Sequence, residues 1–251
     1  MKRMLIAILL AVGVAACGDG LGPGDDSTVS LSFTTRAPNA AAAAGFSASV
    51  MADTLVDGTN TLVITKGEIV LREIELKKQQ YDDCNESMSD DDCEEFETGP
   101  ILVDLPLDGS VETEITIAPP ADTYDELEFE IHKVSNDDPE DAQFRADYPH
   151  MVDKSIRIEG SFNGAAFVYE TDLDVEQEFD LVPPITVTET TGAANVTVLL
   201  DLNQWFRDGS GNLVDPETGN KGGVNESLIK ENIKQSVEAF EDDDHDGHDD
   251  D

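Results

Sequence analysis

The chain has 251 residues, of which 55 are Asp or Glu and 15 are Lys or Arg, and its formal net charge is −40 at pH 7. Such a polyanion repels nucleic acid and anionic head groups, so we exclude nucleic acid as a partner and expect counter-cations to gather around it. About 220 residues follow an N-terminal leader and tether, which is enough for one large β domain or two small ones, and we expect one.

The first sixteen residues have the layout of a secretory signal peptide. Lys2 and Arg3 precede an apolar run from Met4 to Val14, and small residues follow. The run is too short to span a bilayer permanently. We therefore expect the chain to be exported and residues 1–16 to be removed.

The end of this leader carries a lipidation signal. Val14-Ala15-Ala16-Cys17 resembles the lipobox of bacterial lipoproteins, in which the cysteine becomes the lipidated first residue of the mature chain. The alternative is ordinary cleavage after Ala16, with Cys17 left as an incidental thiol. Residues 17–27 then form a flexible, Gly- and Asp-rich tether. By analogy with Gram-negative lipoproteins, Gly18 after the cysteine favours a lipid-anchored location at the outer membrane of the cell envelope.

Cys84 and Cys93 remain as a pair once Cys17 is assigned to lipid. Export places them in an oxidising compartment, and their spacing is unlike that of a redox Cys-x-x-Cys motif. We expect a structural disulfide worth about 2–3 kcal/mol in the chain-entropy model. Many acidic residues surround it between positions 82 and 97, and both a solvated loop and a specific cation site remain open interpretations there.

From Thr28 to Leu200 the hydrophobic pattern has a period of two and predicts short β-strands. The expected strands are 29–33, 62–76 with Gly67 as a bulge, 101–105, 111–117, 127–134, 155–162, 165–171, 175–181 and 195–200. Asp108-Gly109-Ser110, Asn163-Gly164 and Pro183-Pro184 are predicted turns, and Asn163-Gly164 is a strong hairpin signal. This spacing without interleaved helices predicts an antiparallel β-sandwich.

The pattern changes after Asp201. Trp205 and its apolar neighbours predict one helical turn, with the tryptophan closing the core. Asn225 predicts the cap of a helix that docks on the sandwich. The apolar stripe of that helix is Ile229, Ile233, Val237 and Phe240. We therefore expect a mainly β domain over 28–240 with one C-terminal helix, and a disordered acidic tail over 241–251.

The acidic tail contains Asp-x-Asp-x-Asp-Gly, the opening of an EF-hand calcium loop. Oxygen ligands at alternate positions surround a hard cation because the glycine permits a sharp turn. The printed sequence stops at position ten, before the bidentate Glu that a full loop supplies at position twelve. The expected calcium ligands are Asp242, Asp244, Asp246, the carbonyl of His248, and Asp250. A disordered charged tail, and Zn, Ni or Cu bound through its histidines, are the alternatives.

Motifs of common enzyme classes do not occur in the sequence. It has no Gly-x-Ser-x-Gly, no Gly-rich phosphate loop and no His-Glu-x-x-His. Carboxylates are so numerous that spacing alone cannot nominate a glycosidase pair. We therefore expect no enzymatic activity and name no catalytic residues.

The whole layout resembles uncharacterised lipoproteins of Gram-negative bacteria that carry a prealbumin-like β-sandwich domain of unknown function. The resemblance rests on the lipobox at Cys17, the strand Val29–Phe33 leading to Ala37-Pro38, the long strand region 62–76, and the acidic loop before Ile101. It implies a prealbumin-like fold and supplies no catalytic residues.

These features together predict a non-enzymatic, membrane-anchored binding or surface module that associates with divalent cations, calcium foremost. A purely structural envelope lipoprotein is the second hypothesis. A carbohydrate-active enzyme that uses carboxylates is the third.

Overall fold

The computed structural model describes residues 28–35, 53–78, 100–139, 141–188, 194–242 and 244–248. The predicted signal peptide, the tether with Cys17, and the predicted pair Cys84 and Cys93 lie outside the described residues. Within the described part of the chain, no helix combines the length and apolar character needed to traverse a lipid bilayer.

The described part of the chain is mainly β-structure, as the period-two pattern predicts. The strands are β1 (Val29–Thr34), β2 (Asp53–Val56), β3 (Thr61–Lys78), β4 (Ile101–Asp104), β5 (Glu112–Ile117), β6 (Thr123–Ile131), β7 (Ile156–Phe162), β8 (Ala165–Thr171), β9 (Val175–Thr186), β10 (Ala194–Leu200) and β11 (Val237–Glu241). The helical segments are α1 (Ala142–Asp147), η3 (Pro149–Met151), α2 (Leu202–Trp205), η4 (Pro216–Gly219) and α3 (Glu226–Lys234). The sequence pattern does not predict β2, β11 or α1.

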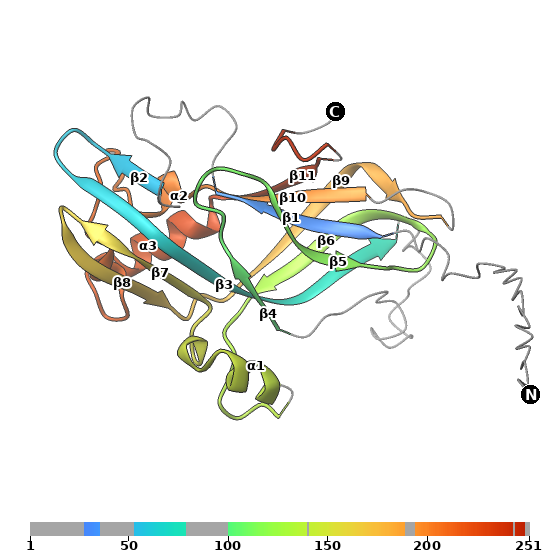
Figure 1. Ribbon diagram of the computed structural model, residues 1–251, viewed down its shortest axis with the longest axis horizontal. Helices are drawn as coiled ribbons and strands as arrows, with labels where there is room; N and C mark the ends of the chain where they lie inside the picture. Colours follow the sequence, from blue (N-terminus) through green and yellow to red (C-terminus); the bar gives the residue numbers. More distant parts are fainter. Residues whose placement is uncertain are drawn as a thin grey trace, which may run out of the picture.

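The larger sheet is organised around the long strand β3 (Figure 1). Its order is β8-β7-β3-β6-β9, and β2 and β4 also pair with β3. β7 pairs with the first half of β3 and β6 with the second half. The predicted hairpin between β7 and β8 is confirmed, because Asn163 and Gly164 both have positive φ, 52° and 83°, as a type I′ turn requires.

The smaller sheet has the order β11-β10-β1-β5 and is mixed. β10 and β11 are antiparallel, and so are β1 and β5, but β1 and β10 run parallel, with Val29 opposite Ala194. The expectation of purely antiparallel pairing is therefore wrong here. A period-two pattern identifies a strand but carries no information about the direction of its neighbour.

Both sheets contribute side chains to one hydrophobic cluster. Leu31 and Val198 come from the smaller sheet, Leu71 and Phe129 come from the larger one, and all four are fully buried. Trp205 belongs to the same cluster and is fully buried, so the prediction that it closes the core is confirmed. Burial of large apolar side chains supplies the main free energy that holds the two sheets together.

Two predictions within the larger sheet are wrong. Gly67 is not a bulge: the register of β3 shifts on either side of it, between Ile64 and Lys66 and between Arg72 and Glu75. Pro183-Pro184 is not a turn either, because β9 continues through both prolines to Thr186. In the described sheet β9 pairs only with β6, and an edge strand tolerates residues that lack an N–H donor.

The C-terminal region also differs from expectation. A helix, α3, begins after Asn225 and buries Ile229 and Ile233, but it ends at Lys234. The predicted continuation through Val237 and Phe240 is wrong, because both residues lie in β11. Asn225 occupies the N-cap position without a capping hydrogen bond. Its side-chain Nδ2 instead donates to Thr218 Oγ1.

An insert between β6 and β7 carries α1 and η3. Figure 1 shows α1 projecting from the larger sheet on the side away from β1 and β10. Phe144 of α1 and Met151 of η3 join Val70 and Val134 in a second, smaller hydrophobic cluster. The insert therefore covers part of the outer face of the larger sheet, which explains why Val70 is buried although it faces away from the main core.

Candidate functional site

The residues of the predicted calcium loop follow directly from β11. Val196 of β10 pairs with Glu241, the last residue of β11, and the backbone N–H of Asp242 then donates to Asn195 O at 3.1 Å. After Asp242 the chain turns back, with positive φ at His245 and Gly247. The expectation of disorder from 241 onward is therefore wrong for Glu241 and Asp242 and for residues 244–248, which have a defined hydrogen-bonded conformation.

The turn brings three alternating aspartates together. Asp242, Asp244 and Asp246 each offer one carboxylate oxygen, and these oxygens all lie within 4.8 Å of one another. Asp242 is fully buried, whereas Asp244 and Asp246 are exposed. A group of oxygen ligands with an exposed side suits a cation that keeps part of its hydration shell.

Backbone N–H groups of the loop donate to these carboxylates. Asp242 Oδ1 accepts from the N–H of Asp246 at 2.9 Å, and Asp242 Oδ2 accepts from the N–H of Gly247 at 3.0 Å. Asp246 Oδ1 accepts from the N–H of His248 at 2.8 Å. Gly247 has a φ of +80°, a conformation that side-chain-bearing residues rarely adopt. The glycine of the motif thus serves the turn that the sequence predicts.

The two histidine rings, which the Zn, Ni or Cu alternative requires, do not join the carboxylates within the described residues, and the His248 carbonyl stays a predicted ligand. The His248 ring is not among the clustered ligand atoms, and its described contact is the backbone N–H to Asp246. The His245 ring lies 3.5 Å from Ser32 Oγ rather than beside the carboxylates. Asp250 lies outside the described residues. The described geometry therefore favours a site built from oxygen ligands over a site built from histidines.

Sequence reasoning missed the polar residues beneath the loop. Thr197 Oγ1 donates to Asp242 Oδ2 at 2.8 Å, and Asn195 Nδ2 donates to the backbone carbonyl of Asp242 at 2.8 Å. Both residues are buried, as is Ser32 of β1. Alternation along β10 places Asn195 and Thr197 on the face opposite the core residues Val196 and Val198. This alternation of polar residues is the sequence feature that could have predicted a polar face of β10 beneath the loop.

A second acidic group lies on β6 and β9. Glu128, Glu176 and Glu178 offer carboxylate oxygens within 4.8 Å of one another. The hydrogen bond with Glu128 raises the pKa of Glu176 above its ordinary value. Lys77 forms ion pairs with Glu128 and with Glu126. This group already has a cationic side chain beside it, which makes it a weaker candidate for a metal site than the loop.

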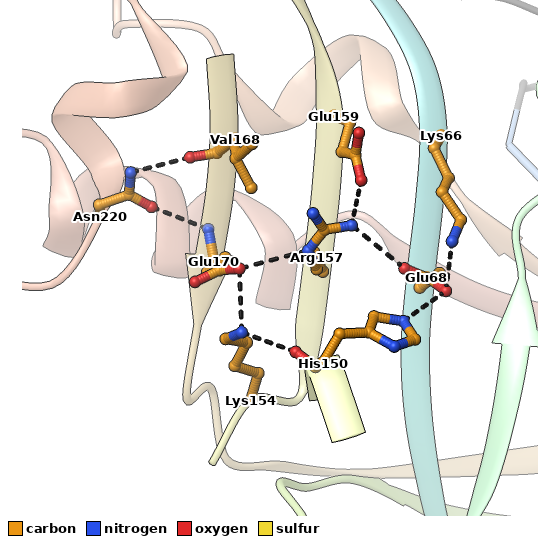
Figure 2. A network of polar contacts seen from close by, with 9 residues as sticks. All are labelled: Lys66, Glu68, His150, Lys154, Arg157, Glu159, Val168, Glu170 and Asn220. Atoms are coloured by element: carbon orange, nitrogen blue, oxygen red, sulfur yellow. Dashed lines mark hydrogen bonds and ion pairs between the residues drawn. The ribbon is translucent and has the colours of Figure 1, made fainter. Parts of the chain in front are cut away.

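An extended polar network covers the outer face of β3, β7 and β8 (Figure 2). Its centre is Glu68, which is 2% exposed. Glu68 Oε1 accepts from Lys66 Nζ at 2.7 Å and lies 3.0 Å from His150 Nε2, while Arg157 Nη1 is 3.5 Å from Oε2. Burial raises the pKa of Glu68, but the hydrogen bonds from Lys66 and His150 outweigh it and lower that pKa overall.

The same network reaches the edge of β8. Arg157 Nε lies 3.2 Å from Glu170 Oε1, which lies 3.0 Å from Lys154 Nζ. The Asn220 side chain accepts from the N–H of Glu170 at 2.8 Å and donates to the carbonyl of Val168 at 3.0 Å (Figure 2). Acids and bases here compensate one another, so the network attaches the insert and η4 to the sheet.

No protein-family model, curated protein or solved structure matches this chain. The features that bear on its function are therefore the C-terminal loop and the fold that holds it.

Proposed function

We propose that this chain is a membrane-anchored, non-enzymatic binding module that associates with calcium through Asp242, Asp244 and Asp246. Its two sheets form a prealbumin-like sandwich in this proposal, supported by the hydrophobic cluster to which both sheets contribute. The lipobox at Cys17 and the leader before it support lipid anchorage in the cell envelope at the outer membrane.

The observation that carries the proposal is the burial of Asp242 without a counter-charge. Its side chain is fully buried, yet its hydrogen-bond donors are a hydroxyl and two backbone N–H groups, all neutral. No described Lys, Arg or His forms an ion pair with it. Buried charges in proteins are normally paired or coordinate a metal ion, and two further carboxylates here add to the negative charge.

The chemistry of the donors selects a hard cation. All three clustered ligands are carboxylates, which suit calcium or magnesium, and no described thiol or imidazole joins them. Calcium accepts six to eight oxygen ligands in irregular geometry and tolerates waters among them, whereas magnesium demands near-ideal octahedral geometry. An open, one-sided group on a turn fits calcium better. The exposure of two of the three ligands favours weak, extracellular-type affinity.

The test is a calorimetric titration of the chelator-treated full-length chain with calcium, in detergent and at fixed ionic strength. We expect one saturable site that Asp244→Asn weakens at least tenfold, since a coordinating carboxylate is lost. Asp147→Asn at the exposed end of α1, on the side of the larger sheet away from β1 and β10 (Figure 1), makes the same change of charge and serves as the matched control, with unchanged affinity. Equal, salt-screened heats in all three proteins would overturn the calcium assignment and favour a purely structural envelope role.

Anchorage is tested separately by fractionating cells that express the chain. Cys17→Ser removes the lipidated side chain, so we expect the protein to move from the membrane fraction to the soluble fraction. Membrane retention of the variant would contradict lipid anchorage at this residue.

A further inference from the structure

A chain of hydrogen bonds crosses the outer face of the smaller sheet and ends on the candidate cation site. Ser32 Oγ of β1 donates to Asn195 Oδ1 of β10 at 2.7 Å. Asn195 Nδ2 donates to Thr197 Oγ1 at 3.2 Å, and Thr197 Oγ1 donates to Asp242 Oδ2 at 2.8 Å. Each of these four residues is at most 2% exposed. The site is therefore connected to the sheet by a buried polar path.

Each donor in this path has its direction set by its neighbour. Asn195 Oδ1 receives the Ser32 hydroxyl, so its Nδ2 side faces Thr197 and the carbonyl of Asp242. Thr197 Oγ1 receives one hydrogen bond from Asn195, so its single hydroxyl proton is available for Asp242. Hydrogen bonds aligned in this way polarise one another and strengthen the last donor, the one that contacts the carboxylate.

The number of donors on each oxygen of Asp242 indicates which oxygen faces a cation. A carboxylate oxygen has two lone pairs. Oδ2 accepts from Thr197 Oγ1 and from the N–H of Gly247, so both of its lone pairs are used. Oδ1 accepts from the N–H of Asp246 alone among the described residues. Counting the described donors, Oδ1 therefore keeps one lone pair for a cation.

From this geometry we infer that Thr197 is a positioning residue of the cation site. It occupies Oδ2, leaves Oδ1 as the single ligand atom of Asp242, and makes cation affinity depend on β10 as well as on the acidic loop. This inference rests on the proposed function, because it concerns the same site. It adds a requirement that the Asp-x-Asp-x-Asp-Gly motif does not contain.

The experiment measures calcium affinity of the full-length chain carrying Thr197→Val, which keeps the shape of the side chain and removes its hydroxyl. Loss of a residue that orients a metal ligand typically weakens binding 10- to 100-fold, and we expect that range here. Thr197→Ser restores the hydroxyl and is expected to bind within about threefold of the unchanged chain. Thr116→Val makes the same substitution at an exposed position of β5 and should leave affinity unchanged.

Two measurements distinguish a role of Thr197 in positioning Asp242 from a role in the stability of the fold, and both from failure of the proposed function. Thermal unfolding in chelator reports the calcium-free fold, and the calcium titration reports the site. A Thr197→Val protein that is less stable but binds calcium as tightly as the unchanged chain would overturn the positioning role. No calcium binding by the unchanged chain would overturn the proposed function itself. Thr197→Ala, with the same expected loss, replaces the valine variant if that variant does not fold.

Discussion

Single residues tie distant segments of this fold together, and Asp57 is the clearest case. Its Oδ1 accepts from the N–H groups of Thr59 and Asn60 at 2.7 and 2.6 Å, which closes the turn between β2 and β3. Its Oδ2 accepts from the N–H of Leu213 at 2.8 Å, across 156 residues of sequence. The N–H groups of Asn60 and then Thr59 hold the pKa of Asp57 well below its ordinary value of 3.8.

This depressed pKa predicts a pH dependence of stability. The free energy contributed by ionised Asp57 is fully present above pH 3.8 and is lost as the pH falls below that value toward the folded-state pKa. Asp57→Asn is therefore expected to be less stable than the unchanged chain at pH 7, with a difference that shrinks at about pH 3. Urea unfolding at both pH values measures it, and Asp180→Asn is the charge-matched control. A stability difference between Asp57→Asn and the unchanged chain that is the same at both pH values would contradict a depressed pKa of Asp57.

Trp205 supports a second prediction at this scale. Its Nε1 donates to Ser236 Oγ at 2.7 Å in the buried interior. Trp205→Phe leaves a cavity and removes that donor, and we expect the free energy of unfolding to fall by about 1–3 kcal/mol. Circular dichroism must follow the unfolding, because the variant has no tryptophan. If the two side chains are coupled, the Trp205→Phe/Ser236→Ala double variant should lose less free energy of unfolding than the two single variants lose together. Strictly additive losses would contradict this coupling.

At the scale of elements, β7 approaches β3 so closely that a side chain has no room at Gly160. A Cβ atom there would lie 2.0 Å from the carbonyl oxygen of Val63 and 3.0 Å from Phe167 Cε1. The register between the two strands shifts next to this position, between Ile64 and Lys66. The glycine allows the strands to remain paired across the shift.

Gly160→Ala is expected to lower the free energy of unfolding by about 1–3 kcal/mol, because the strands must separate locally to admit the methyl group. Gly209→Ala is the matched control, since nothing lies within 4 Å of its added Cβ, and it should change stability by less than about 0.5 kcal/mol. Chemical unfolding of the three proteins measures the difference. Equal stabilities would show that β3 and β7 move apart without cost.

After Lys234 the chain forms a strand where the apolar spacing predicts a helix. The spacing of Ile229, Ile233, Val237 and Phe240 fits one helical stripe, and the first two residues do lie on α3. The chain nevertheless leaves the helix, because β10 offers a free edge with which residues 237–241 pair. Local periodicity does not report such an edge, so tertiary pairing overrides it.

For the whole molecule, charge dominates the expected response to solution conditions. The net charge of −40 makes the folded chain repel itself. Salt shortens the screening length from about 30 Å at 0.01 M to about 8 Å at 0.15 M, so we expect the melting temperature to rise with KCl over that range. Calorimetry measures this rise. Calcium added at constant ionic strength should raise the melting temperature further in the unchanged chain, and raise it less in Asp244→Asn, whose site is weaker. A melting temperature that falls with KCl would contradict self-repulsion.

The sequence by itself determined the mainly β character, most of the strands, the Asn163-Gly164 hairpin, the burial of Trp205 and the loop motif of the tail. These properties depend on alternation, turn chemistry and residue spacing, which are local. Only the tertiary structure decided the parallel pairing of β1 with β10, the strand after α3, and the burial of Asp242 against Thr197. Each of these depends on which distant segment lies alongside, and a buried carboxylate acquires its partners from such a segment rather than from its own neighbours in the chain.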